Sequence, residues 1–246
     1  MRKAPKHRLL IVGDSISLGV EELRISEIVA TVQTCYVDLL RERLPATEII
    51  VDADIHRTTT AALSVIDALL AQHQPCLVLL MLGGNDADVE WRRFIISEGR
   101  IVRNRLTVAQ CGANLQLLAS KVIAAGAFPI LTDMPNHDLA RRGPYLSQLS
   151  GKDVSALIAG NGGQQRSDIG LLAYHDAAAE AAKTTHSAFV AYGAALHRFP
   201  AAEVIGTDGV HPNFKGHQII AHELLPNLEV ALQRCAEHHV SAAQTR

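Results

Sequence analysis

Three short motifs hold the side-chain types that catalytic sites use, and the first of them offers a nucleophile. Gly13-Asp14-Ser15 directly follows an apolar run at residues 9–12. Glycine permits a tight turn, and a serine at a helix N-terminus lies where backbone N–H groups favour a developing negative charge. The alternative is a Ser or Asp that only caps a helix. Ser15 is therefore a candidate nucleophile.

The second motif offers an uncharged hydrogen-bond donor. Gly83-Gly84-Asn85-Asp86 follows the apolar residues 76–82. The two glycines leave the backbone open, and a preorganised Asn85 amide is suited to an oxyanion that forms during a reaction. The alternative is an ordinary Gly-Gly-Asn turn in a loop.

The third motif pairs an acid with a base. Asp208 and His211 stand three residues apart in Asp208-Gly209-Val210-His211, just before the last helical stretch. A carboxylate that holds the Nδ1–H of a histidine leaves Nε2 to take a proton from a serine. The alternative is a capping Asp and a surface His. Together the three motifs supply a nucleophile, an oxyanion donor, a base and an orienting acid.

Apolar runs that alternate with helix-like stretches must position these motifs. We expect strands at residues 9–12, 48–53, 76–82, 128–132 and 188–192. The expected helices are 16–44 with a break near 24–26, 60–72, a helix ending near 125, 171–184, and 214–225 with an extension from Pro226. This alternation is typical of a parallel sheet, in which the loops at the carboxyl ends of the strands meet at one edge.

Two segments depart from this regular pattern. Residues 136–170 contain several Gly and Ser, and we interpret them as an irregular cap or substrate loop. The tail after about residue 237 is expected to fray. There is no internal repeat and no interdomain linker, so one domain spanning residues 1–246 is the simplest interpretation.

The three motifs resemble the conserved blocks of the SGNH (GDSL-type) hydrolases, in the family's order from residue 9 to about residue 225. The resemblance implies a flavodoxin-like three-layer α/β/α fold with a central parallel sheet of about five strands. It also implies that Ser15 attacks an ester carbonyl, that His211 is the base and that Asp208 orients it. Asn85 and the Ser15 N–H would hold the oxyanion. The G-x-S-x-G elbow of the larger α/β-hydrolases is absent.

One block departs from the family pattern. The second block normally carries a glycine whose backbone N–H completes the oxyanion hole, but residues 53–59 contain none. Arg57 is the nearest counterpart by spacing, so its backbone N–H is the expected third donor. His56 and Arg57 are then expected to project toward the substrate, beside Gly84. Asp14 also lies at the substrate site, where we expect its carboxylate to bond loop N–H groups.

Composition excludes several classes of protein. A net charge of -2 and an aromatic content of 4% argue against a nucleic-acid partner. No run approaches the roughly 20 apolar residues of a membrane span, and the four dispersed cysteines form no CxxC pair. We therefore expect a cytoplasmic protein with reduced thiols, no metal site and no cofactor. The arginines between 92 and 105 are interpreted as a solvated face paired with Glu90 and Glu98, the alternative being recognition of an anion.

The leading hypothesis is a serine hydrolase that cleaves a carboxylic ester, such as an O-acetyl or short acyl ester, through an acyl-enzyme. The substrate would be a small molecule, or a lipid or carbohydrate ester. One alternative is an acyltransferase that passes the acyl group to an acceptor other than water. Another is a catalytically weakened binding protein, which the missing glycine of the second block would explain. The sequence does not address the oligomeric state.

Overall fold

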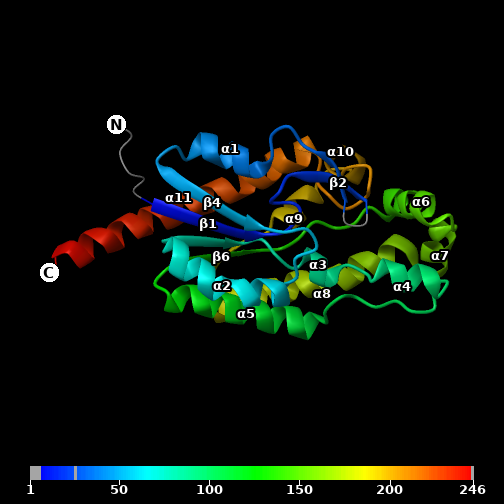
Figure 1. Ribbon diagram of the computed structural model, residues 1–246, viewed down its shortest axis with the longest axis horizontal. Coiled ribbons are helices and arrows are strands. Elements are labelled where there is room, and N and C mark those ends of the chain that lie inside the picture. Colours follow the sequence, from blue (N-terminus) through cyan, green and yellow to red (C-terminus); the bar gives the residue numbers. More distant parts are fainter. Residues whose placement is uncertain (1–6, 25–26, 245–246) are drawn as a thin grey trace.

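The five expected strands form one parallel sheet in the computed structural model, which describes residues 7–24 and 27–244, with side chains as far as residue 237. The strands of this sheet are β1 (His7–Gly13), β4 (Thr47–Ala53), β5 (Leu77–Leu80), β6 (Phe128–Thr132) and β7 (Ala188–Val190). They lie in the order β4-β1-β5-β6-β7 (Figure 1). All neighbouring pairs are parallel.

Alternation along the strands builds two cores, one on each face of the sheet. Leu9 and Ile11 of β1 belong to one buried cluster, whereas Leu10 and Val12 belong to the other. Successive side chains of a strand point to opposite faces, so a strand covered on both faces is a continuous apolar run. This is why the apolar runs could be recognised as strands.

Helices cover both faces and complete three layers (Figure 1). One face packs against α1 (Tyr36–Arg43), α9 (Tyr192–Leu196) and α11 (Phe214–Gln244). The other packs against α2 (Thr59–His73), α5 (Val108–Ala124) and α8 (Gly163–Thr184). The remaining short helices are α3 (Gly84–Ala87), α4 (Trp91–Ile96), α6 (Leu139–Ser150), α7 (Val154–Gly160) and α10 (Ala201–Val204). The predicted flavodoxin-like α/β/α fold is confirmed.

The strand order places a crevice between β1 and β5. The chain runs outward from β1 to β4 and then returns to the other side of β1 with β5. In such sheets ligands bind at the carboxyl ends of the strands, where the order reverses. The first two motifs follow these two strands, so the topology brings them side by side.

The predicted helix over residues 16–44 is wrong in its first half. A tight turn is followed by an antiparallel hairpin of β2 (Val20–Arg24) and β3 (Glu27–Thr31), and only α1 is helical. Gly19 at φ +73° diverts the chain from a helical path, and the Ile, Val and Thr of β3 favour an extended backbone. The expected break at 24–26 falls where this hairpin turns, and residues 25–26 lie outside the described part.

The expected irregular loop over residues 136–170 is instead mostly helical, with α6, α7 and the start of α8. Asp138 and Asp153 cap the first two helices by accepting the N–H groups of Ala140 and Ala156. Gly151 ends α6 in the left-handed conformation at φ +68°. The polar and Gly residues that suggested irregularity are therefore the caps of short helices.

The C-terminal tail also differs from the expectation of fraying. Helix α11 continues past Pro226 as far as Gln244. None of the helices within the described residues is long and apolar enough to cross a membrane.

Candidate active site

The turn after β1 holds Ser15 at the end of the sheet. Gly13 is required there, because a Cβ at this position would lie 2.0 Å from the Ser17 Oγ. The Asp14 carboxylate accepts the Ile16 N–H at 3.0 Å and so closes the turn. Ser15 is 4% exposed and lines a cavity.

A helix was expected behind Ser15, but residues 15–19 form turns. The N–H groups of residues 17–19 donate to carbonyls within these turns, so the expected support from a helix N-terminus is absent behind Ser15. Ser17, the other serine of this turn, forms a hydrogen bond with Tyr36 in the core, with 2.7 Å between the two hydroxyl oxygens. Its hydroxyl is engaged away from the cavity, which agrees with the choice of Ser15.

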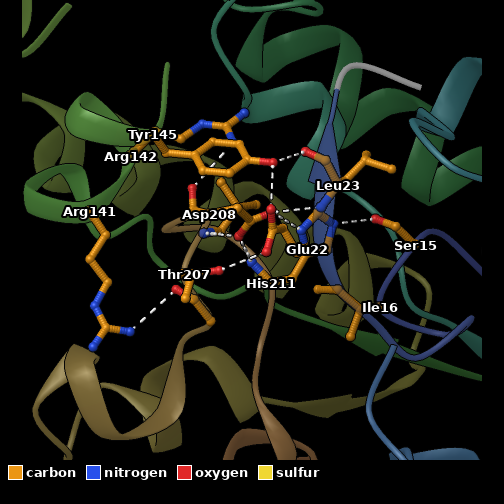
Figure 2. Close-up of polar contacts among 12 residues, drawn as sticks. Ser15, Ile16, Glu22, Leu23, Arg141, Arg142, Tyr145, Thr207, Asp208 and His211 are labelled. Atoms are coloured by element: carbon orange, nitrogen blue, oxygen red, sulfur yellow. Dashed lines mark hydrogen bonds and ion pairs between the residues drawn. The ribbon is translucent and has the colours of Figure 1, made fainter. Parts of the chain in front are cut away.

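His211 and Asp208 continue from Ser15 in an unbroken chain of hydrogen bonds (Figure 2). The His211 Nε2 lies 2.8 Å from the Ser15 Oγ, and the His211 Nδ1 lies 2.6 Å from the Asp208 Oδ2. All three side chains are buried, with His211 5% and Asp208 0% exposed. The structure brings Ser15 to the Asp208–His211 pair, which lies almost 200 positions later in the sequence.

The surroundings of Asp208 favour its ionised form. Burial would raise the pKa of this carboxyl, but hydrogen bonds and charge from His211, and the N–H of Val210, hold the pKa below its usual value. Oδ1 accepts the N–H groups of Val210 and His211 at 2.9 and 3.1 Å, and Oδ2 also accepts the Leu23 N–H at 3.2 Å. The β2 strand that the sequence did not predict thus supplies one donor to the acid.

Asn85 and Asp14 face one another across the crevice. The Asn85 Nδ2 donates to the Asp14 Oδ2 at 3.1 Å. Burial raises the pKa of Asp14 to about 6, although the Ile16 N–H and Asn85 oppose the rise. Asp14, Asn85 and Gly84 all line the cavity with Ser15. The expectation that the Asp14 carboxylate bonds loop N–H groups agrees with this geometry.

Asp86, the last residue of the second motif, connects that motif to the turn of residues 53–59. Its carboxylate accepts the Thr59 backbone N–H at 3.0 Å, and it also bonds the Thr59 hydroxyl. Asp86 is 0% exposed, and Thr59 begins α2. Asp86 therefore fixes the first residue of α2, and with it the turn of residues 53–59, beside the cavity.

Arg57 is not arranged as expected. Its guanidinium bonds the carbonyl of Asp52 at 2.9 Å and pairs with the Asp52 carboxylate, so it turns back along β4 instead of toward a substrate. Its backbone N–H donates to the Asp54 carbonyl at 3.3 Å and is engaged within its own turn. His56, at φ +61°, does line the cavity. The structure thus brings His56 to the site and leaves Arg57 out of it.

The cavity that opens from Ser15 has a volume of about 780 Å³ and extends between α4 and α6. The sequence did not single out several of its lining residues, namely Trp91, His137, Arg142 and Tyr145, although the last three belong to the segment interpreted as a cap or substrate loop. The last two lie on α6, in the segment taken for a loop. An Asp at 138 ahead of the apolar Leu139 and Leu146 was a signal for that helix, but nothing in the sequence indicated where it would pack.

The arginines between 92 and 105 are largely paired. Arg93 and Arg103 lie 3.0 and 4.0 Å from the Glu90 carboxylate, and both are well exposed. Arg105 pairs with Asp88 at 3.2 Å inside the cavity. The solvated-face interpretation therefore agrees with the contacts of Arg93 and Arg103, and Arg105 departs from it. Within the described residues, no three His, Cys, Asp or Glu side chains gather as metal ligands.

Comparisons with known proteins assign the chain to a family. Residues 11–219 match the GDSL-like lipase/acylhydrolase family. The chain belongs to that family. The assignment supports a hydrolase that acts on small-molecule esters. No curated protein matches the sequence.

Solved structures of esterases share the fold of this GDSL-like protein. The crystal structure of TesA has 23% sequence identity and a TM-score of 0.62, over 91% of this chain and 99% of that one. A lipase/acylhydrolase from Enterococcus faecalis has 20% identity and a TM-score of 0.65, over 90% and 95%. A catalytic mutant of Axe2, an acetylxylan esterase from Geobacillus stearothermophilus, has 19% identity and a TM-score of 0.61, over 92% and 95%.

Proposed function

We propose that this protein cleaves carboxylic esters through an acyl-enzyme formed on Ser15. The observation that carries the proposal is the relay from the Ser15 Oγ to His211 Nε2 at 2.8 Å and from His211 Nδ1 to Asp208 at 2.6 Å. These distances fall within the reach required of a nucleophile, its base and the group that orients the base.

In this mechanism His211 takes the Ser15 proton as the Oγ attacks the ester carbonyl. The protonated His211 then gives that proton to the departing alcohol, and the acyl group stays on Ser15. A water molecule, deprotonated by His211 in turn, releases the acid. Asp208 remains ionised throughout, consistent with its lowered pKa, and stabilises the imidazolium.

The oxyanion is held by Asn85 and by the Ser15 backbone N–H. One hydrogen of the Asn85 Nδ2 is engaged by Asp14 at 3.1 Å, and an amide nitrogen carries two, so the second is left to donate. The Arg57 N–H is bonded to Asp54 and supplies no third donor. Loss of one donor lowers kcat by about 10²–10³-fold in a well-studied hydrolase, so we expect modest turnover.

A cavity of about 780 Å³ has room for a small ester and for a chain longer than acetyl. An O-acetyl or short acyl ester is the simplest substrate. Transfer of the acyl group to an acceptor other than water uses the same acyl-enzyme. The two outcomes differ in product, because hydrolysis releases free acid and transfer yields a new ester.

The test is turnover of p-nitrophenyl acetate, butyrate and octanoate by wild type, Ser15→Ala and Ser17→Ala. We expect Ser15→Ala to abolish nitrophenol release and labelling by a fluorophosphonate. Ser17→Ala is the matched control, because its hydroxyl bonds Tyr36 in the core. If wild type is inert toward all three esters and the fluorophosphonate fails to label Ser15, the hydrolase proposal falls and a binding role replaces it.

A further inference from the structure

The cavity has two regions of different chemistry beyond the Ser15 end. Helices α4 and α6 provide an apolar channel lined by Trp91, Ile95, Ile96, Leu146 and Leu149. Cationic side chains also line the cavity, and they outnumber the carboxylates. The cations are Arg92, Arg93, Arg105, Arg142 and Lys152, and the carboxylates are Asp14, Asp88 and Glu90.

Ion pairs account for only part of this positive charge. Arg105 pairs with Asp88 at 3.2 Å and Arg93 pairs with Glu90 at 3.0 Å. Asp14 bonds the Ile16 N–H and Asn85 instead of a cation. Arg92, Arg142 and Lys152 are left without an ion pair among the described residues that line the cavity. Arg142 is the one that contacts the Asp208 loop, through the Asp208 carbonyl.

Arg142 is held beside the site without a counter-ion. Its Nη1 donates to the Asp208 carbonyl oxygen at 3.2 Å. Its guanidinium lies over the Trp91 ring, 5.8 Å from the ring centre. It also lies over the Tyr145 ring, 6.0 Å from the centre (Figure 2). Its Nε is buried with no hydrogen-bond partner, and no carboxylate of the described residues pairs with its guanidinium. The donors left for a ligand in the cavity are therefore on the Nη groups, of which only Nη1 has a hydrogen-bond partner. A partly desolvated guanidinium without a counter-ion favours a bound anion.

We propose that Arg142 recognises an anionic group, a carboxylate or a phosphate, on the ester that this cavity binds. The inference rests on the proposed function, because the anionic group must reach Arg142 while the ester carbonyl lies at Ser15. The planar guanidinium bonds carboxylate and phosphate oxygens with two parallel N–H groups, and such charge-assisted bonds are stronger than neutral ones. The apolar channel between α4 and α6 accommodates the uncharged remainder of the substrate.

A structural role for Arg142 predicts a different result. If the side chain only clamps the Asp208 carbonyl, its removal slows anionic and neutral esters equally. If it binds an anion, its removal lowers kcat/KM for the anionic ester alone, mainly through KM. The ratio of the two rates therefore separates the roles.

The experiment compares ester pairs that differ in charge. Mono-p-nitrophenyl glutarate is matched with p-nitrophenyl valerate, which tests an anion on the acyl side. Acetoxybenzoate and acetoxyphenyl phosphate, each matched with phenyl acetate, test the alcohol side and distinguish carboxylate from phosphate. The variants are Arg142→Gln and Arg142→Lys, with Arg103→Gln as a control that removes a nearby exposed charge outside the cavity.

We expect wild type to prefer the anionic member of at least one pair. Arg142→Gln should reduce that preference by about ten- to a hundredfold, the range for a hydrogen bond to a charged group. Arg142→Lys should retain part of it, and Arg103→Gln should leave it unchanged. An equal loss for both members of every pair, or a wild-type preference for the neutral esters throughout, overturns the inference.

Binding to Ser15→Ala keeps this test independent of turnover. Calorimetry with mono-p-nitrophenyl glutarate and acetoxyphenyl phosphate should show binding that Arg142→Gln removes in the same background. If wild type hydrolyses nothing but this binding and its loss are seen, the hydrolase proposal fails and the anion site stands. If neutral esters are hydrolysed at Ser15 but neither anion binds, the anion site fails and the hydrolase proposal stands.

Discussion

Replacing Asp208 with Asn tests whether the acid acts through the tautomer of His211. The Asp208 Oδ1 accepts two backbone N–H groups, and Oδ2 accepts the His211 Nδ1–H at 2.6 Å and the Leu23 N–H at 3.2 Å. If the Asn oxygen keeps the two backbone bonds, its NH₂ group faces His211 Nδ1. His211 must then accept at Nδ1 and carry its proton on Nε2, where it cannot take the proton of Ser15.

The expected loss follows from this inversion. The same substitution in a serine protease lowers kcat by about 10⁴-fold, which corresponds to about 5.4 kcal/mol in the activation barrier. The Leu23 N–H also loses its acceptor, and an unsatisfied buried donor costs about 1–3 kcal/mol of folding free energy. Asp208→Asn should therefore be folded, moderately less stable and almost inactive.

The assay is kcat with p-nitrophenyl acetate for wild type, Asp208→Asn and Asp67→Asn, beside urea unfolding of each. Asp67 of α2 is exposed, pairs with Lys121 of α5 and does not line the cavity, so its Asn variant controls for the loss of a carboxylate. A folded Asp208→Asn within tenfold of wild-type kcat would refute the assignment of Asp208 as the orienting acid. Inactivity of Asp67→Asn would point instead to a general effect of lost charge.

Two further predictions concern the loops that carry the motifs. Gly209→Ala should disrupt the Asp208–His211 turn, because Gly209 has φ +76° and a Cβ there would lie 2.5 Å from the Asp138 carbonyl oxygen and from the Arg142 nitrogen. We expect Gly209→Ala to lose most of its esterase activity and about 1–3 kcal/mol of stability. Gly160→Ala should change neither, because a Cβ at position 160 has no neighbour within 4 Å. Equal behaviour of the two variants would contradict the packing argument. Asp14→Asn should alter the pH dependence of stability, because burial raises the pKa of Asp14 from 3.8 to about 6. Folded protein then binds more protons than unfolded chain between these values, so the contribution of Asp14 to stability is full below pH 4 and is lost as the pH rises through 6. The free energy of unfolding of Asp14→Asn relative to wild type should rise by up to about 3 kcal/mol from pH 4 to pH 7 in urea titrations; a difference that stays flat with pH excludes this account.

The strands and the motif residues could be predicted because each depends on local sequence. The run at residues 128–132 matches β6, since a strand buried on both faces is mostly apolar, as it is up to Thr132. Ser15, Asn85, Asp208 and His211 were found for a similar reason, because each motif directly follows an apolar strand or precedes a helix. The parallel topology then brings the motifs to one edge of the sheet without further information.

The hairpin of β2 and β3 could not be read in the same way. Its residues carry apolar positions that also suit a helix. Contacts with distant residues add to the extended preference of β3, namely the Leu23 N–H to Asp208 and the Tyr145 hydroxyl to the Leu23 carbonyl. The helices over 139–160 were hidden by the Gly and polar residues that cap them. In both segments tertiary packing decided between two local structures of similar propensity.

The sequence by itself determined the family, the layered fold and the approach of Ser15, His211 and Asp208, because these follow from the period of the apolar residues and the order of the motifs. Tertiary structure alone decided what surrounds them. Arg57 was expected at the site, yet its guanidinium pairs with the Asp52 carboxylate and its backbone N–H donates to the Asp54 carbonyl. Arg142 was not expected there, yet α6 carries it over the Asp208 carbonyl. Side-chain partners of this kind lie far apart in the chain or depend on the course of a turn, and no local pattern encodes them.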